Sequence, residues 1–124
     1  MKTPTDRVYS ESHEWMHVDG DMLTIGLTSF AVDQLTDVTF VEMLPDGTVL
    51  EAGDSIGEVE SVKTTSDIYT PVGGEIIEVN DALADNPEMV NADPYGDGWL
   101  VKIRIEDQGT LGNCMDAEAY DASL

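Results

Sequence analysis

The chain of 124 residues has few basic side chains, one cysteine and no long apolar stretch. The single cysteine, Cys114, excludes an internal disulfide and is predicted to be a small, reduced packing residue near the C-terminus. No apolar run is long enough to span a bilayer. Residues 1–10 lack both the apolar stretch of a signal peptide and the arginine-rich pattern of a transit peptide. We therefore expect a cytoplasmic protein.

Acidic residues outnumber basic ones by 26 to 5, which gives a formal net charge of −21. A surface of this sign repels phosphate backbones and anionic lipid, so nucleic acids and membranes are excluded as partners. Proteins with basic docking patches are favoured instead. The acidity also suits a chain that stays soluble in a salty cytoplasm, where screening relieves self-repulsion, and the two explanations are compatible.

Short strand-like runs separated by turn residues dominate the sequence. The length and a hydrophobic content of 41% predict one globular domain over residues 1–124. The predicted strands are Glu14–Val18, Met22–Leu27, Val38–Leu44, Ile56–Val62, Ser66–Thr70, Glu75–Asn80 and Trp99–Ile105. Helical segments are predicted at Phe30–Leu35, within Asp81–Gly98 and at Met115–Tyr120. This pattern predicts a mainly β sandwich or flattened barrel with short peripheral helices.

Alternation and spacing predict which side chains are buried. In the last predicted strand, Trp99, Val101, Ile103 and Ile105 share the face expected to be buried. In the first helix, the buried face is expected to be built from Phe30, Ala31, Val32 and Leu35, with Thr28 or Ser29 as the N-cap.

The segment His13-Glu14-Trp15-Met16-His17 matches the H-E-x-x-H signature of zinc metalloproteases. That chemistry needs both histidines on one face of a helix, with the glutamate next to a metal-bound water. A turn at Asp19-Gly20 follows at once and leaves no room for such a helix. We therefore interpret the segment as a strand with His13, Trp15 and His17 on one side, and we expect no metal.

Lysine is scarce, and one lysine has an unusual position. Of Lys2, Lys63 and Lys102, only Lys63 lies at a predicted hairpin tip; Lys2 is near the N-terminus and Lys102 is within a strand. A modifying ligase needs an amine that projects from a rigid, exposed turn and can be deprotonated. Lys63 is therefore the candidate for covalent modification, the alternative being an ordinary solvated turn lysine.

Four motifs stand in order along the sequence, Ser12-His13-Glu14-Trp15, Thr24–Thr28, Glu60-Ser61-Val62-Lys63 and Asn91–Trp99, and they resemble those of the H proteins of the glycine cleavage system. Glu60-Ser61-Val62-Lys63 is similar to the lipoylation motif of that family. Ser12-His13-Glu14-Trp15, Thr24–Thr28 and Asn91–Trp99 resemble its other segments, in the same order and at similar spacing. Biotin carriers have methionine on both sides of the modified lysine, and 2-oxo-acid dehydrogenase lipoyl domains favour aspartate before it; neither pattern is present here.

The resemblance implies a barrel-sandwich hybrid fold and a carrier function rather than catalysis. Lipoic acid would be amide-linked to Lys63. It would carry an aminomethyl group from the pyridoxal-phosphate-dependent glycine decarboxylase (P protein) to the tetrahydrofolate-dependent aminomethyltransferase (T protein), with reoxidation by dihydrolipoamide dehydrogenase (L protein). A lipoyl ligase or transferase is a further implied partner, and the carrier is expected to be a monomer. Two alternatives stay open: a lipoyl relay that donates lipoate to other carrier domains, and an unmodified scaffold.

An aminomethyl thioether is prone to hydrolysis, so resting it against the protein would prolong its life. Its amine is cationic, and a carboxylate is the natural partner for it. Glu14 and Asp67 are the candidate carboxylates, and Ser12 is the candidate hydrogen-bonding neighbour. The alternative is that both acids are ordinary members of an acidic surface.

Overall fold

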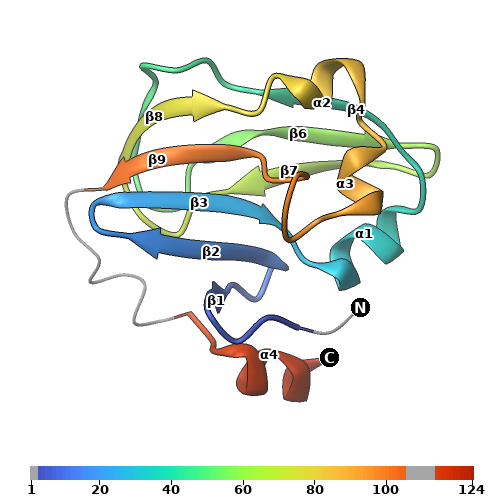
Figure 1. Cartoon of the computed structure of the whole chain (residues 1–124), viewed down its shortest axis with the longest axis horizontal. Helices are drawn as coiled ribbons and strands as arrows, with labels where there is room; N and C mark the ends of the chain where they lie inside the picture. The colour runs from blue at the N-terminus through green and yellow to red at the C-terminus, as the bar shows by residue number, and fades with distance from the viewer. Residues whose placement is uncertain (1–2, 106–113) are drawn as a thin grey trace.

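The computed structural model describes residues 3–105 and 114–124, which form two β-sheets packed face to face with short helices at the rim (Figure 1). One sheet has the strand order β1-β2-β3-β9-β8-β5, and the other has the order β4-β6-β7. The strands are β1 (Val8–Tyr9), β2 (Glu14–Asp19), β3 (Met22–Leu27), β4 (Val38–Met43), β5 (Val49–Leu50), β6 (Ser55–Ser61), β7 (Thr65–Tyr69), β8 (Gly74–Val79) and β9 (Val101–Ile105). The mainly β prediction is confirmed, and the architecture is that of a sandwich.

The main core lies between the two sheets. Alternate residues of each strand point inward, because successive side chains of a strand face opposite sides. In the six-stranded sheet Leu23 and Ile25 of β3 lie opposite Ile103 and Val101 of β9, and all four side chains are fully buried. The other sheet contributes its own buried side chains, Val59 of β6 and Ile68 of β7. The alternation predicted for Val101, Ile103 and Ile105 is confirmed.

Trp99 departs from its predicted place. β9 begins at Val101, and Trp99 lies before the strand, half-buried, with its ring against the ammonium of Lys102. Leu100 is fully buried instead, and its backbone N–H donates to the carbonyl of Ile25. The alternation of buried and exposed side chains fails at these two residues because they precede strand β9 and do not have its regular backbone conformation.

Four short helices lie around the sheets: α1 (Ser29–Leu35), α2 (Ala82–Asp85), α3 (Met89–Ala92) and α4 (Ala117–Ser123). Thr28 is the N-cap of α1, since its hydroxyl accepts from the N–H of Ala31 at 3.2 Å. Only Val32 and Leu35 of the expected α1 face are buried, whereas Phe30 and Ala31 are half-buried. The expected single helix within residues 81–98 is two one-turn helices. No described helix is long and apolar enough to cross a membrane.

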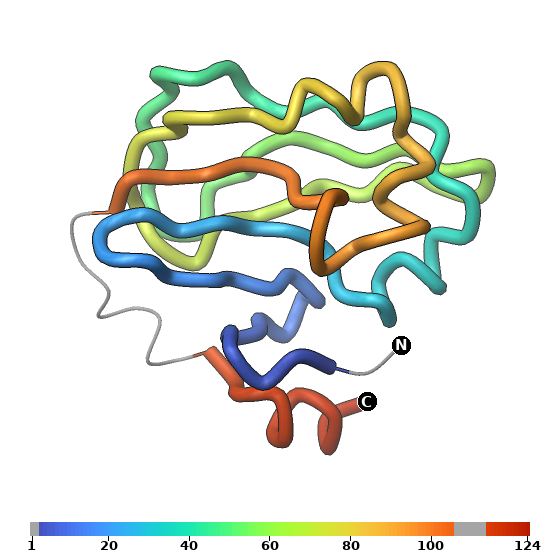
Figure 2. Tube along the Cα trace, in the orientation of Figure 1, coloured from blue at the N-terminus to red at the C-terminus, as the bar shows by residue number. Residues whose placement is uncertain are grey.

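A second, smaller core joins the two ends of the described chain. It consists of Tyr9, Trp15, Ala117 and Tyr120, which pack on the outer side of β2. The rings of Tyr9 and Tyr120 stack at 4.9 Å, and the backbones of Tyr9 and Met115 exchange two hydrogen bonds of 2.7 Å. Figure 2 shows α4 lying beside the N-terminal segment. The two-residue strands β1 and β5 escaped prediction, because they are too short to show an alternating pattern.

Candidate functional site

Lys63 lies at the tip of the hairpin that joins β6 to β7, as predicted. The two strands pair antiparallel up to Glu60 and Thr65. Ser61 closes the turn: its N–H donates to the Thr64 carbonyl at 2.8 Å, and its hydroxyl accepts from the N–H groups of Lys63 and Thr64 at 3.2 and 3.0 Å. These bonds fix the backbone of the tip while the Lys63 side chain stays exposed.

A backbone hydrogen bond to the segment before β4, the strand paired with β6, also anchors the hairpin tip. The N–H of Val62 donates to the carbonyl of Asp37, just before β4, at 3.1 Å. The Val62 side chain is itself 68% exposed, so the tip presents an apolar residue next to the amine. Across residues 3–105 and 114–124, no ion pair engages the Lys63 ammonium. The arrangement presents a free amine on a fixed backbone.

A groove of about 330 Å³ begins beside this turn. Its apolar lining comes from β3, α1 and β7, and its polar lining from the turn before β2, α1 and the hairpin. The lining residues are Ser12, His13, Leu27, Ala31, Gln34, Leu35, Thr64, Ser66, Asp67 and Ile68. We call this the hairpin groove. Thr64, the residue after Lys63, lines the groove, so the groove begins next to the exposed Lys63 side chain. Its volume falls at the lower end of the range of about 300–1,000 Å³ for small-molecule sites.

The structure brings the candidate residues together in two different ways. Ser12, from the turn before β2, and Asp67, from β7, both line the hairpin groove. Glu14 does not line it: this residue opens β2 opposite Leu27, points between the sheets and is only 2% exposed. The description of Glu14 as an ordinary surface acid is therefore wrong, whereas Asp67 is exposed.

Hydrogen bonds link the buried Glu14 carboxylate to the groove. Its Oε1 accepts from the hydroxyls of Ser10 and Ser12 at 2.5 and 2.6 Å. Its Oε2 lies 3.5 Å from the N–H of Tyr69 at the end of β7. A buried carboxylate needs such donors, because an unpaired buried charge is costly. Ser12 is thus the polar connection between Glu14 and the hairpin groove.

The histidines of the H-E-x-x-H segment have separate surroundings. His13 lies in the turn before β2 with φ of 71°, so it is not part of the strand as predicted. Its Nδ1 lies 2.7 Å from the hydroxyl of Tyr120, which in turn lies 2.7 Å from Oγ1 of Thr28. His17 is in β2, with Nε2 4.0 Å from Asp6. No helix carries the motif, and no group of metal-binding residues occurs in the part of the chain that the structure describes.

Several contributors to the groove carried no recognisable signal in the sequence. Leu27, Leu35 and Ile68 belong to three different elements and show only ordinary strand and helix patterns. Tyr120 acts from the far end of the chain by contacting His13. Cys114 is half-buried against the core, and burial raises the pKa of its thiol, in agreement with a packing role. Lys2 lies outside the described residues.

Comparison with known proteins identifies the family. A sequence model of the glycine cleavage H-protein family matches residues 7–124. The chain is 49% identical over 124 residues to the glycine cleavage system H protein of Thermus thermophilus, covering 100% of this chain and 97% of the relative. It is 47% identical over 122 residues to that of Bacteroides thetaiotaomicron, covering 98% and 97%.

A solved structure agrees with both. The crystal structure of a glycine cleavage system H protein from Mycobacterium marinum superposes with a TM-score of 0.85 at 38% identity, covering 97% of each chain. The chain therefore belongs to the glycine cleavage H-protein family and is a lipoyl carrier of the glycine cleavage system.

Proposed function

We propose that lipoic acid is attached through an amide to Lys63 and that the arm rests in the hairpin groove when loaded. The observation that carries the proposal is the exposed, hydrogen-bonded turn that presents Lys63 beside this groove. A ligase requires such an accessible amine on a fixed backbone. When bound, the lipoyl group supplies a reducible dithiolane that accepts and releases the aminomethyl cargo.

The residues present fit such a group. Ala31, which is half-buried, and the edges of Leu27, Leu35 and Ile68, which are only 2–4% exposed, form a narrow apolar lining for a hydrocarbon chain and its sulfur ring. Ser12 and Asp67 add polar atoms on the rim for the cationic amine of the cargo. An apolar lining with a few placed polar groups is typical of small-molecule sites.

We assign different roles to the two candidate carboxylates. Asp67 is exposed on the groove and is the residue that would face the cargo amine directly. Glu14 is buried, with its Oε1 occupied by two serine hydroxyls, so it acts through Ser12. The Glu14 carboxylate orients the Ser12 hydroxyl through this hydrogen bond, without itself lining the groove.

The carrier itself is proposed to have no catalytic role. One domain spanning residues 1–124 would carry the arm between the P, T and L proteins, after a lipoyl ligase or transferase has modified Lys63. A net charge of −21 opposes self-association, which supports a monomer. Activity in a reconstituted glycine cleavage assay separates this function from the alternative role as a lipoyl relay.

The mass of the protein from its native host tests the attachment site. We expect one lipoyl addition that is lost in Lys63→Arg, because a guanidinium is not an acylatable amine. Lys102→Arg is the matched control, since it makes the same exchange on a strand and should leave the addition in place. An addition that persists in Lys63→Arg, or that disappears in Lys102→Arg, would contradict the assignment.

A further inference from the structure

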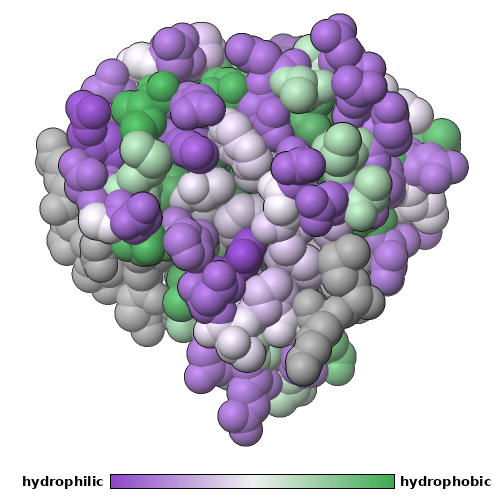
Figure 3. Space-filling model, viewed as in Figure 1, coloured by the Kyte–Doolittle hydropathy of each residue, from purple (hydrophilic) through white to green (hydrophobic). Residues whose placement is uncertain are grey.

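The few cations of this acidic chain are not evenly distributed. Of five basic residues, Lys102 and Arg104 lie on the outer face of β9, since Val101, Ile103 and Ile105 point into the core. Arg7 lies beside β2 of the same sheet, against the ring of Trp15. Figure 1 is viewed with this sheet towards the reader, and Figure 3 shows pale side chains of intermediate hydropathy near the middle of that face, among purple ones.

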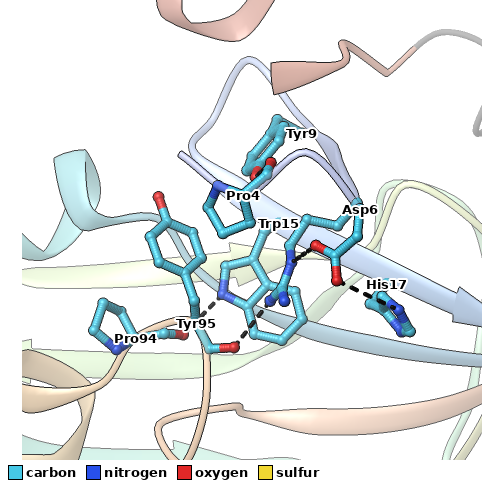
Figure 4. Close-up of polar contacts among 8 residues, drawn as sticks. Pro4, Asp6, Tyr9, Trp15, His17, Pro94 and Tyr95 are labelled. Atoms are coloured by element: carbon cyan, nitrogen blue, oxygen red, sulfur yellow. Dashed lines mark hydrogen bonds and ion pairs between the residues drawn. The ribbon is translucent and has the colours of Figure 1, made fainter. Parts of the chain in front are cut away.

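A surface groove of about 240 Å³ lies where these cations meet aromatic rings. The lining includes Arg7, Trp15, His17, Tyr95, Trp99 and Lys102. We call it the cation–aromatic groove. Trp15 lies flat over Gly26 of β3, where a Cβ atom would approach the indole to 2.5 Å, so the glycine allows the ring to lie on the sheet. The indole Nε1 donates to the carbonyl of Pro94 at 2.8 Å, which fixes the ring (Figure 4).

The Arg7 side chain is fully engaged in contacts on one side of the groove. Its guanidinium carbon is 4.5 Å from the Trp15 ring centroid, and its Nη1 donates to the carbonyl of Tyr95 at 2.9 Å. Its Nε pairs with Asp6 at 2.9 Å, and the hydrogen bond from Arg7 lowers the pKa of that carboxyl (Figure 4). Asp6 therefore stays ionised and offsets the charge of Arg7.

Lys102 on the opposite side of the groove is not offset in this way. Its ammonium lies 5.0 Å from the Trp99 ring centroid. Glu78 is its cross-strand neighbour on β8, yet the described residues contain no ion pair between them. Lys102 is thus a positioned cation with no carboxylate partner in this part of the chain. Aromatic contact orients a lysine without neutralising it.

We propose that the cation–aromatic groove receives one Asp or Glu side chain of a partner enzyme, which pairs with Lys102 while its aliphatic part lies against Trp99. The inference rests on the carrier function, because it assigns the groove to an enzyme that the carrier visits. The volume is below the usual 300–1,000 Å³ of small-molecule sites and suits a side chain. Tryptophan, tyrosine and arginine are the residues enriched at the centres of protein interfaces.

The surrounding charge makes such a contact selective. A partner's carboxylate is repelled over most of a surface with 26 acidic residues and is attracted only where a cation is uncompensated. One carboxylate on an otherwise basic docking surface would therefore fix the orientation of the complex. The groove is also linked to the hairpin groove: the Tyr95 hydroxyl accepts from the N–H of Ser29 at 3.0 Å, at the start of the helix α1 that lines the arm site.

Zero-length carbodiimide coupling tests the contact directly, because it joins an amine only to a carboxylate that touches it. The lipoylated carrier is mixed in turn with the decarboxylase, the aminomethyltransferase and the dehydrogenase, and cross-linked peptides are identified by mass spectrometry. We expect Lys102 to couple to an Asp or Glu of at least one enzyme, well above the level seen at Lys2. Coupling at Lys102 no greater than at Lys2 with all three enzymes would overturn the proposal.

Steady-state kinetics with the enzyme that cross-links to Lys102 add a matched comparison. Lys102→Glu should raise the KM for the carrier by about fivefold or more with little change in kcat, since a surface pair is lost and a repulsion added. Arg104→Glu makes the same charge reversal two residues along the same strand, outside the groove lining, and should have a smaller effect. Equal increases in KM for the two variants would indicate a general electrostatic effect of the surface charge, and they would contradict the proposed site.

Two further readouts keep the outcomes distinct. The lipoyl mass at Lys63 is measured in each variant; its absence would be a failure of the proposed function and not of the groove. Tryptophan fluorescence is titrated with inorganic phosphate. Saturable quenching that disappears in Lys102→Gln would identify a free-anion site and overturn the assignment to a partner's side chain, whereas an unchanged signal supports it.

Discussion

The two outer sheet faces of this protein contrast in charge and in cover. The three-stranded sheet presents a row of carboxylates: Glu42 of β4 lies opposite Glu58 of β6, which lies opposite Asp67 of β7. The six-stranded sheet presents Lys102 and Arg104 opposite Glu78 and Glu75, so its charges are mixed, and its β2 side is covered by the second core and α4. Like charges directly across strands are destabilising. This acidic face belongs to the sheet that carries the Lys63 hairpin, whereas the covered face contains most of the aromatic packing.

The two faces differ in what their side chains contribute to folding. On the covered face, side chains such as Trp15 and Tyr120 are buried and fix the two ends of the described chain to the sheet. On the acidic face, Glu42 and Asp67 are exposed and contribute little packing. Substitution of the buried rings should therefore lower the free energy of unfolding, whereas substitution of exposed charged side chains should change folding little and act mainly on carrier behaviour.

The largest effect is expected at the centre of the covered face. Trp15→Ala removes a ring that is 2% exposed and packs on Gly26 and Arg7. We expect the free energy of unfolding to fall by about 3–5 kcal/mol, the usual cost of truncating a buried large aromatic residue. Urea unfolding followed by circular dichroism measures the change. A loss below about 1 kcal/mol would mean that this face can close over the cavity and that the contrast is overstated.

The hairpin groove offers a smaller effect that should appear in function and not in folding. Asp67→Asn removes the charge at an exposed position, so the free energy of unfolding should change by less than about 0.5 kcal/mol. Release of the aminomethyl cargo to water should become severalfold faster, because a charge-assisted hydrogen bond is lost at a partly solvated site. Hydrolysis of the loaded carrier, followed by release of formaldehyde, is the measurement.

Glu14→Gln is the companion variant, and unlike Asp67→Asn it should lower the stability of the fold as well. The amide replaces a carboxylate that accepts from Ser10 and Ser12, so stability should fall by about 1–3 kcal/mol as well as the protection of the cargo. Lipoylation of Lys63 should be unchanged in both variants. Wild-type hydrolysis rates in both would exclude the carboxylates and leave burial against Leu27, Leu35 and Ile68 as the source of protection.

The row of carboxylates predicts a still smaller effect with the opposite sign. Glu58→Gln removes the middle charge and should raise the free energy of unfolding by about 0.2–1 kcal/mol. Added monovalent salt should stabilise the wild type for the same reason, and it should stabilise the variant less. Thermal melts over a range of ionic strength test both. Equal salt dependence would show that the repulsion is spread over the whole surface.

No effect is expected from a metal chelator. His13 contacts Tyr120, and His17 approaches Asp6, so neither histidine is arranged for zinc. Removal of a structural metal would lower the melting temperature, because its binding energy contributes to folding. An unchanged melt in the presence of chelator is the expected result, and stoichiometric zinc in the purified protein would contradict it.

The local signals in the sequence predicted most of the strands and the position of the Lys63 hairpin. Alternation located Val101, Ile103 and Ile105 in the core, and Thr28 marked the start of α1. Such patterns depend on residues that are close together in the sequence, so they can be recognised without a structure. They failed at Trp99 and at the two-residue strands, where contacts made across the fold decide the conformation.

The sequence by itself determined the charge of this protein, its mainly β class and the single lysine at a hairpin tip. Tertiary structure alone decided that Glu14 is buried behind Ser12 while Asp67 is exposed, although both are acids within or next to strands. It also decided that Arg7, Trp99 and Lys102 meet in one groove. The physical reason is that burial and contact depend on which sheet faces pack together, and side chains distant in the chain set this jointly.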